Sequence, residues 1–178
     1  MDIYTNNEEL ENSFRFLNKR NIIEMNGIDN PNAFKKKNNK SDVVNLFFLA
    51  RLDFSHKGVD ILLKALSKLK DFFEKENCYF SIYGNGSEKE LKKFNKYMNK
   101  IDSERIVYKG CIFGDEKNHM YNNQDICVLP SRYEGFPTSI TEALFFVKKV
   151  IEIRSHLLYS YHAVFYCTLL FYKVIFFY

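Results

Sequence analysis

Apolar and polar residues follow two patterns between positions 43 and 146, and each pattern predicts a different element. Short, nearly continuous apolar runs are typical of strands buried on both faces, and they lie at 43–50, 79–83, 105–108 and 126–129. Between these runs, apolar residues recur at intervals of three or four, which is typical of amphipathic helices. Helices are expected at 59–73 and 87–99, near 116–121, and around Glu142. Strands separated by helices of this length predict an α/β fold, a Rossmann-like parallel sheet with flanking helices.

Turn and capping residues support these boundaries. Ser87, followed three residues later by Glu90, is a capping box that predicts the start of a helix. The strand before it is closed by Gly84-Asn85-Gly86. The run at 126–129 stops at Pro130, and a Gly and a Pro separate it from the next helical pattern. A further strand is expected within 147–153.

The two ends of the chain depart from this pattern, so three parts are predicted. Residues 1–42 are interpreted as an N-terminal helix within 6–19, a short strand within 21–25 and a polar junction or linker. Residues 43–153 are interpreted as the Rossmann-like domain. Residues 154–178 are an atypical tail, because 157–178 is almost wholly apolar and aromatic. An altered chain end, a C-terminal membrane anchor and a pair of core strands are all compatible with this tail.

Composition narrows the class of protein only slightly. The 178 residues suffice for one domain, and the net charge of +4 is spread along the chain. Nucleic-acid binding is not favoured, because it usually requires a concentrated basic face. No signal peptide is recognisable at the N-terminus, so a cytoplasmic location is expected. The cysteines lack C-x-x-C spacing and are interpreted as buried, reduced side chains; they are Cys78, Cys111, Cys127 and Cys167.

Two carboxylates after the run at 126–129 are candidates for ligand binding. Glu134 lies in the loop at the carboxyl end of this strand, and Glu142 lies about one turn into the following helix. Ligands of open α/β sheets bind outside the carboxyl ends of the strands, so both carboxylates could face a polyhydroxylated ligand. The start of the helix favours an anion. A ligand with hydroxyl and phosphate groups fits this combination, although an ordinary strand–turn–helix with surface acids has the same pattern.

The loop after the first strand of the domain is a second candidate site, suited to a diphosphate. Arg51 can form a bidentate fork, Lys57 adds a compact charge, and a helix begins beyond Gly58. Gly84 and Gly86 follow the next strand and would allow a backbone to approach a ligand closely. Glycines at such turns also occur for purely structural reasons, so both interpretations stay open.

Together these motifs resemble the group-1 glycosyltransferases, the retaining glycosyltransferases of family 4 with a GT-B fold. Tyr133–Pro137 followed by Glu142-Ala143 resembles the family's E-x7-E signature, and Arg51–Gly58 resembles its R-x(4,5)-K-G element. The resemblance runs from about Asn26 to Ile153 and implies the C-terminal, donor-binding half of a GT-B fold. After Phe146 the glycine-containing turns of the family are missing.

The resemblance implies a donor site with a nucleotide side and a sugar side. On the nucleotide side it implies Arg51 and Lys57 at the phosphates, Gly84 and Gly86 beside the nucleotide, Ile112 beside the base, and Glu142 at the ribose hydroxyls. Core packing is an equal explanation for Ile112. On the sugar side it implies Glu134, Gly135, Phe136 and Pro137. Catalysis is implied to rest on Glu134, Arg51 and Lys57. No metal motif is recognisable, so a metal-independent mechanism without a cofactor is expected, in which cations offset the charge of the leaving diphosphate.

The predicted function is transfer of a sugar from a nucleotide diphosphate sugar to a saccharide or lipid-linked acceptor, with retention. The isolated chain is expected to bind nucleotide weakly without turnover, and a partner chain would supply the missing N-terminal domain. The alternatives are a non-catalytic nucleotide-binding or interaction module, membrane-associated through 157–178, and a degenerate remnant. The sequence does not define the base, the sugar, the acceptor or the oligomeric state.

Overall fold

A computed structural model of the chain describes residues 3–4, 22–23, 42–133, 138–146 and 149–152. β1 (Ile3–Tyr4) and β2 (Ile22–Ile23) pair as a parallel two-stranded sheet, and β2 is the short strand expected within 21–25. Several expectations lie outside the described residues: the helix within 6–19, the linker, the tail at 154–178, and the residues Glu134, Gly135, Phe136 and Pro137.

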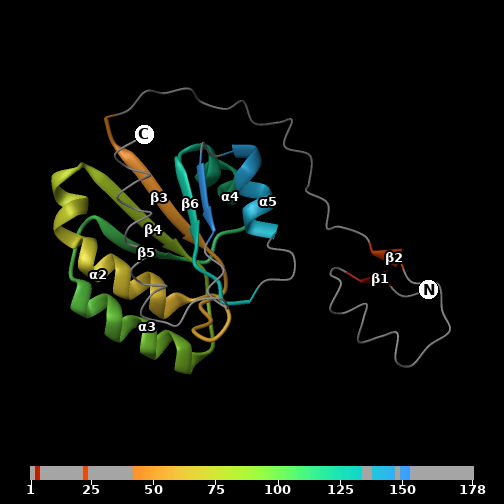
Figure 1. Cartoon of the computed structure of the whole chain (residues 1–178), viewed down its shortest axis with the longest axis horizontal. Coiled ribbons are helices and arrows are strands. Elements are labelled where there is room, and N and C mark those ends of the chain that lie inside the picture. Colours follow the sequence, from red (N-terminus) through yellow and green to blue (C-terminus); the bar gives the residue numbers. More distant parts are fainter. Residues whose placement is uncertain (1–2, 5–21, 24–41, 134–137, 147–148, 153–178) are drawn as a thin grey trace.

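Five parallel strands form the central sheet, in the order β5–β4–β3–β6–β7 (Figure 1). They are β3 (Val44–Leu49), β4 (Cys78–Tyr83), β5 (Ile106–Gly110), β6 (Ile126–Leu129) and β7 (Lys149–Glu152). The chain runs outward from β3 to β5, crosses to the other side of β3, and continues through β6 to β7. This is the doubly wound arrangement, and its direction reverses between β3 and β6 at the topological switch point. The predicted Rossmann-like parallel sheet is confirmed.

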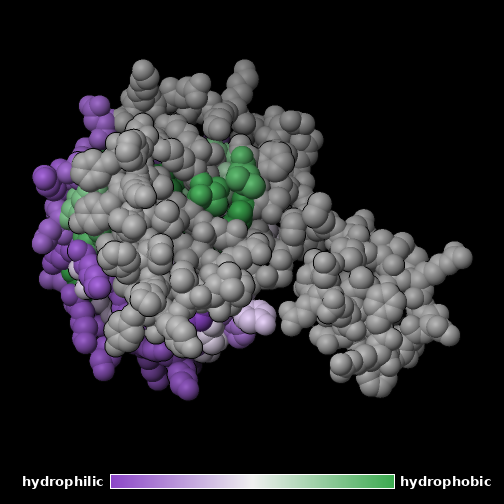
Figure 2. Space-filling model, viewed as in Figure 1, coloured by the Kyte–Doolittle hydropathy of each residue, from purple (hydrophilic) through white to green (hydrophobic). Residues whose placement is uncertain are grey.

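Helices cover both faces of this sheet (Figure 1). The core on one face is built with α2 (Val59–Lys75) and α3 (Glu88–Ile101), and the core on the other face with α4 (Gly114–Asn122) and α5 (Thr138–Phe146). Hydrophilic side chains cover the side of the molecule on which α2 and α3 lie (Figure 2). None of the described helices combines the length and the hydropathy needed to cross a membrane.

The alternation of side chains along β3 explains why two cores form. Leu46 and Phe48 are fully buried in the core beneath α2 and α3. Phe47, between them, is fully buried on the opposite face with Tyr121 and Phe146. A strand covered on both faces gains stability from every apolar position, which is why this segment is apolar at every position except Asn45.

The expectation that the cysteines are buried is confirmed for two of the described cysteines and is wrong for a third. Cys78 and Cys127 are buried, and burial raises the pKa of the first thiol to about 11 and of the second to about 12. Cys111 is exposed, because it lies just beyond the last residue of β5, where the chain leaves the sheet.

Candidate functional site

A cleft of about 470 Å³ lies beyond the carboxyl ends of β3, β4 and β5, a size that suits a small ligand. Its described walls come from the loops after these strands and from the first turns of α4 and α5. Of the residues predicted for the donor site, Arg51, Lys57, Gly84, Ile112 and Glu142 all line it. They come from four separate segments of the chain, and the sheet topology brings them to one place.

Backbone hydrogen bonds fasten the loops of the cleft to one another. The Leu52 N–H donates to the Asn85 carbonyl at 2.8 Å, which joins the loops after β3 and β4. The Gly84 N–H donates to the carbonyl of Gly110, the last residue of β5, at 2.9 Å. These bonds involve main-chain atoms only, so the relative position of the three loops is set by the path of the backbone.

Gly84 and Gly86 have structural reasons to be glycines. Gly84 has a φ of +143°, and a Cβ atom there would lie 1.9 Å from the Ala50 carbonyl oxygen. At Gly86 a Cβ atom would lie 2.8 Å from the Leu52 carbonyl oxygen. Both glycines therefore allow the loops after β3 and β4 to touch. Gly84 also lines the cleft, whereas Gly86 packs against Leu52 in the loop after β3.

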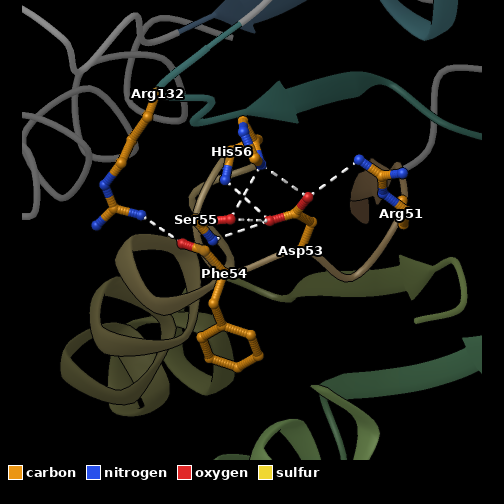
Figure 3. A network of polar contacts seen from close by, with 6 residues as sticks. All are labelled: Arg51, Asp53, Phe54, Ser55, His56 and Arg132. Carbon is orange, nitrogen blue, oxygen red and sulfur yellow. Dashed lines mark hydrogen bonds and ion pairs between the residues drawn. The ribbon is translucent and has the colours of Figure 1, made fainter. Parts of the chain in front are cut away.

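Asp53 organises the loop that carries Arg51 and Lys57 (Figure 3). Its Oδ1 accepts hydrogen bonds from the Ser55 N–H at 2.9 Å, the Ser55 hydroxyl at 2.7 Å and the His56 N–H at 2.9 Å. Its Oδ2 accepts from the Arg51 guanidinium at 3.0 Å and lies 3.0 Å from His56 Nδ1. The Asp-x-Ser spacing is a local turn signal that could have revealed this role from the sequence.

The geometry of Asp53 also determines its charge state. Partial burial favours the neutral form, but the hydrogen bonds from Ser55 and His56 outweigh it, so the pKa of Asp53 lies well below its usual value. The Asp53 side chain is 15% exposed, whereas that of Arg51 is 67% exposed. A covered carboxylate thus anchors one side of a guanidinium that remains open to a ligand.

Replacing Asp53 by Asn should lower the free energy of unfolding by about 1 kcal/mol at pH 7, because an amide nitrogen cannot accept the bonds from Arg51 and His56. A carboxylate with a depressed folded-state pKa stabilises the fold above its unfolded pKa, and this contribution is lost as the pH falls below the ordinary value of 3.8. Urea unfolding at pH 7 and at pH 3 measures the effect. The difference between wild type and Asp53→Asn should shrink at pH 3, and a constant difference would contradict the assigned role.

Arg132 joins the loop after β6 to the start of α2, a link that no local sequence pattern indicates. Its guanidinium donates to both carboxylate oxygens of Asp60, at 2.7 and 2.8 Å, and to the Phe54 carbonyl at 2.7 Å (Figure 3 shows the latter bond). The Arg132 N–H also donates to the His56 carbonyl at 2.7 Å. The pKa of Asp60 is lowered, because the hydrogen bonds and charge of Arg132 outweigh the effect of burial. The pair fixes the two loops that meet at the topological switch point.

Glu142 is held by two residues of α4 that sequence reasoning missed. Its Oε1 accepts a hydrogen bond from the Lys117 ammonium at 2.7 Å, and its Oε2 accepts one from the Tyr121 hydroxyl at 2.8 Å. Burial, followed by the nearby Glu142 charge, raises the pKa of Tyr121, so its hydroxyl remains a donor. Lys117 and Tyr121 are one helical turn apart, but nothing local in the sequence indicates their partner.

The helix ends at the cleft differ in part from expectation. Thr138 and Ser139, which begin α5, line the cleft, and anion binding by this helix start stays a prediction. Gly114 at the start of α4 also lines it. The start of α2 was expected to offer free N–H groups to a diphosphate. Gly58 instead packs beneath the Pro130 carbonyl, and Val59 is fully buried in the core.

Comparison with known proteins assigns this domain to a family. Residues 44–156, more than half of the chain, match the family described as glycosyl transferases group 1. The chain belongs to this family. An uncharacterized glycosyltransferase of Haemophilus influenzae is 32% identical over 136 residues, which are 75% of this chain and 36% of that protein. The matched part is 24% of an uncharacterized glycosyltransferase of Methanocaldococcus jannaschii. The chain thus spans about a quarter to a third of the length of these curated relatives.

Solved glycosyltransferase structures share the fold of the chain. A glycosyltransferase from Rickettsia africae superposes with a TM-score of 0.66 at 20% identity, over 84% of this chain and 43% of that one. A TarM variant of S. aureus, in complex with UDP and alpha-GlcNAc-glycerol, superposes with a TM-score of 0.65 at 18% identity. It covers 93% of this chain and 36% of its own. These likenesses identify the Rossmann-like half of a GT-B glycosyltransferase fold.

Proposed function

We propose that the cleft binds the nucleotide part of a nucleotide diphosphate sugar, and that the chain is the donor domain of a retaining glycosyltransferase of family 4. The observation that carries this proposal is the meeting of Arg51, Lys57 and Glu142 in one cleft at the carboxyl ends of the strands. Cations suit a diphosphate, and a carboxylate suits hydroxyl groups. The group-1 family match supports the same chemistry.

In the proposed reaction, Arg51 and Lys57 offset the negative charge that develops on the leaving nucleotide diphosphate, together with the helix start at Thr138. This mechanism needs no metal ion or other cofactor. Ile112, which packs partly against the core and partly lines the cleft, is proposed to lie beside the base. Glu134 to Pro137 are proposed, from the resemblance alone, to bind the transferred sugar.

The acceptor is proposed to be a saccharide or a lipid-linked saccharide that binds outside the matched region. The chain corresponds to only 24–36% of the curated relatives, so the remaining parts of such proteins have room for an acceptor site. The reduced thiols Cys78, Cys111 and Cys127 support a cytoplasmic location. Membrane contact through 157–178 and a partner chain with the N-terminal domain stay predictions.

Calorimetric titration of UDP and GDP into the full chain tests the proposal. We expect saturable binding of at least one nucleotide, unchanged by EDTA, and about ten-fold weaker binding by Lys57→Ala, because a charge-assisted contact to phosphate is lost. Lys96→Ala is the matched control, since Lys96 is an exposed lysine of α3. A folded sample that binds neither nucleotide, or a Lys57→Ala variant with the affinity of the control, would contradict the proposal.

A further inference from the structure

The carboxylate of Glu142 is held by α4 from two directions. Lys117 and Tyr121 lie one turn apart on this helix, and Glu142 reaches them from α5. Each donor takes a different carboxylate oxygen, Lys117 at 2.7 Å and Tyr121 at 2.8 Å. Lys117 and Glu142 both line the cleft, whereas Tyr121 lies behind them in the core. The carboxylate therefore cannot rotate without losing one of two charge-assisted bonds.

Tyr121 is fixed by its ring. The side chain is fully buried, stacked on Phe146 with ring centroids 5.4 Å apart, and edge-on to Phe47 at 5.4 Å. A phenol has one proton to donate. The distance of 2.8 Å to Glu142, against 3.3 Å to the Ser139 carbonyl, shows that this proton is directed mainly to the carboxylate.

The remaining acceptor positions of Glu142 select the kind of group that can bind. A carboxylate has about four lone-pair positions, and one on each oxygen is already taken. The side chain is 22% exposed, so the other positions are within reach from the cleft. An ionised carboxylate only accepts hydrogen bonds, so the ligand group must be a donor. Two neighbouring hydroxyls match two oxygens, whereas a phosphate would be repelled.

Lys117 has a second effect in the cleft. Its ammonium offsets the charge of Glu142 beside a site that is proposed to hold a diphosphate at Arg51 and Lys57. An unpaired carboxylate in the same cleft would weaken phosphate binding. The ion pair therefore leaves the Glu142 oxygens free to accept hydrogen bonds while reducing their repulsion of a bound diphosphate.

We propose that Lys117 and Tyr121 are positioning residues that aim Glu142 at the 2′- and 3′-hydroxyls of a ribose, so that the cleft selects ribonucleotides over 2′-deoxyribonucleotides. The proposal rests on the proposed function, because it places the nucleotide in this cleft. It adds the two residues that set the sugar specificity of the nucleotide. Their effect is measured as a ratio of affinities, which a purely structural role would leave unchanged.

The test is calorimetric titration of UDP, GDP and their 2′-deoxy forms into the full chain. Wild type should bind the better ribonucleotide about ten-fold more tightly than its 2′-deoxy form, since a hydrogen bond to a charged group is lost. Tyr121→Phe keeps the stacked ring and should reduce this ratio to about three-fold or less, as should Lys117→Met. Lys117→Arg keeps the ion pair and should preserve the ratio. Tyr97→Phe, on α3, is the matched tyrosine control, and thermal unfolding verifies that every variant is folded.

Each of the other possible titration results would contradict a specific part of the argument. Ribo- and deoxyribonucleotides bound equally by wild type would overturn the inference and leave the proposed function standing. An unchanged ratio in Tyr121→Phe and Lys117→Met would overturn the positioning role. If Lys117→Met weakened both forms equally, Lys117 would act on the phosphates instead. Failure of the folded wild-type chain to bind either nucleotide would overturn the proposed function and the inference together.

Discussion

Replacing Gly58 by Ala should destabilise the domain by about 3–5 kcal/mol, through backbone strain and overlap together. Gly58 has a φ of +62°, a conformation that costs an L-residue about 1–2 kcal/mol. A Cβ atom there would also lie 1.8 Å from the Pro130 carbonyl oxygen. The clash involves backbone on both sides, so no side-chain rotation relieves it. The loops after β3 and β6 must separate, and urea unfolding monitored by circular dichroism measures the cost.

Gly114 supplies a matched control for this prediction. It also has a positive φ, +54°, and also lies at the start of a helix, but an added Cβ would meet nothing within 4 Å. Gly114→Ala should therefore show the conformational cost alone, about 1–2 kcal/mol. Equal destabilisation by the two variants would show that the contact between Gly58 and Pro130 contributes nothing.

Replacing Arg132 by Met should lower the free energy of unfolding by about 2–3 kcal/mol. Removing one partner from a buried ion pair costs about 3–5 kcal/mol, and the partial exposure of this pair reduces the cost. Arg132 is 26% exposed and Asp60 is 17% exposed, so water can only partly rehydrate the carboxylate that remains. Lys64, at 3.8 Å from Asp60, offers weak compensation. Urea unfolding at pH 7 measures the loss.

Acid titration of this variant tests the cause of the loss. The pKa of Asp60 is depressed in the folded protein, so its contribution to stability is present above the unfolded value of 3.8 and is lost as the pH falls below it. Wild type should thus lose stability more steeply than Arg132→Met below pH 4. Lys75→Met is the control, because Lys75 is 82% exposed and lies 3.9 Å from its partner Glu76, and it should cost less than about 1 kcal/mol. Parallel acid profiles for wild type and Arg132→Met would contradict the role of the pair.

Local sequence patterns determined most of the elements. The apolar run at 43–50 predicted β3, and apolar residues at intervals of three and four predicted α2. Buried positions are apolar, so the spacing of apolar residues along a segment shows whether one or both of its faces are covered. Ser87 marked the start of α3, where its hydroxyl accepts from the Glu90 N–H at 3.3 Å. These signals span a few residues, so no knowledge of the rest of the chain is needed to find them.

Motif positions also determined much of the candidate site. Short motifs predict Arg51, Lys57 and Glu142 as site residues, and the structure brings them to one cleft. This succeeded because parallel strands place all their carboxyl ends at the same edge of the sheet. Once the strands were predicted, the loops that follow them had to be neighbours.

Only the tertiary structure decided which side chains pair across those loops. Arg132 and Asp60 are 72 positions apart, and Lys117 and Glu142 are 25 apart. Many lysines and acids of this chain could have paired, and the choice follows from the strand order and the packing of α4 against α5. The contact of Gly58 with Pro130 has the same origin, since the reversal of the sheet between β3 and β6 places these loops side by side. The sequence thus determined the helices, the strands and the polar residues in the loops after the strands. Tertiary packing determined which side chains pair, because pairing depends on distances between segments that no local pattern contains.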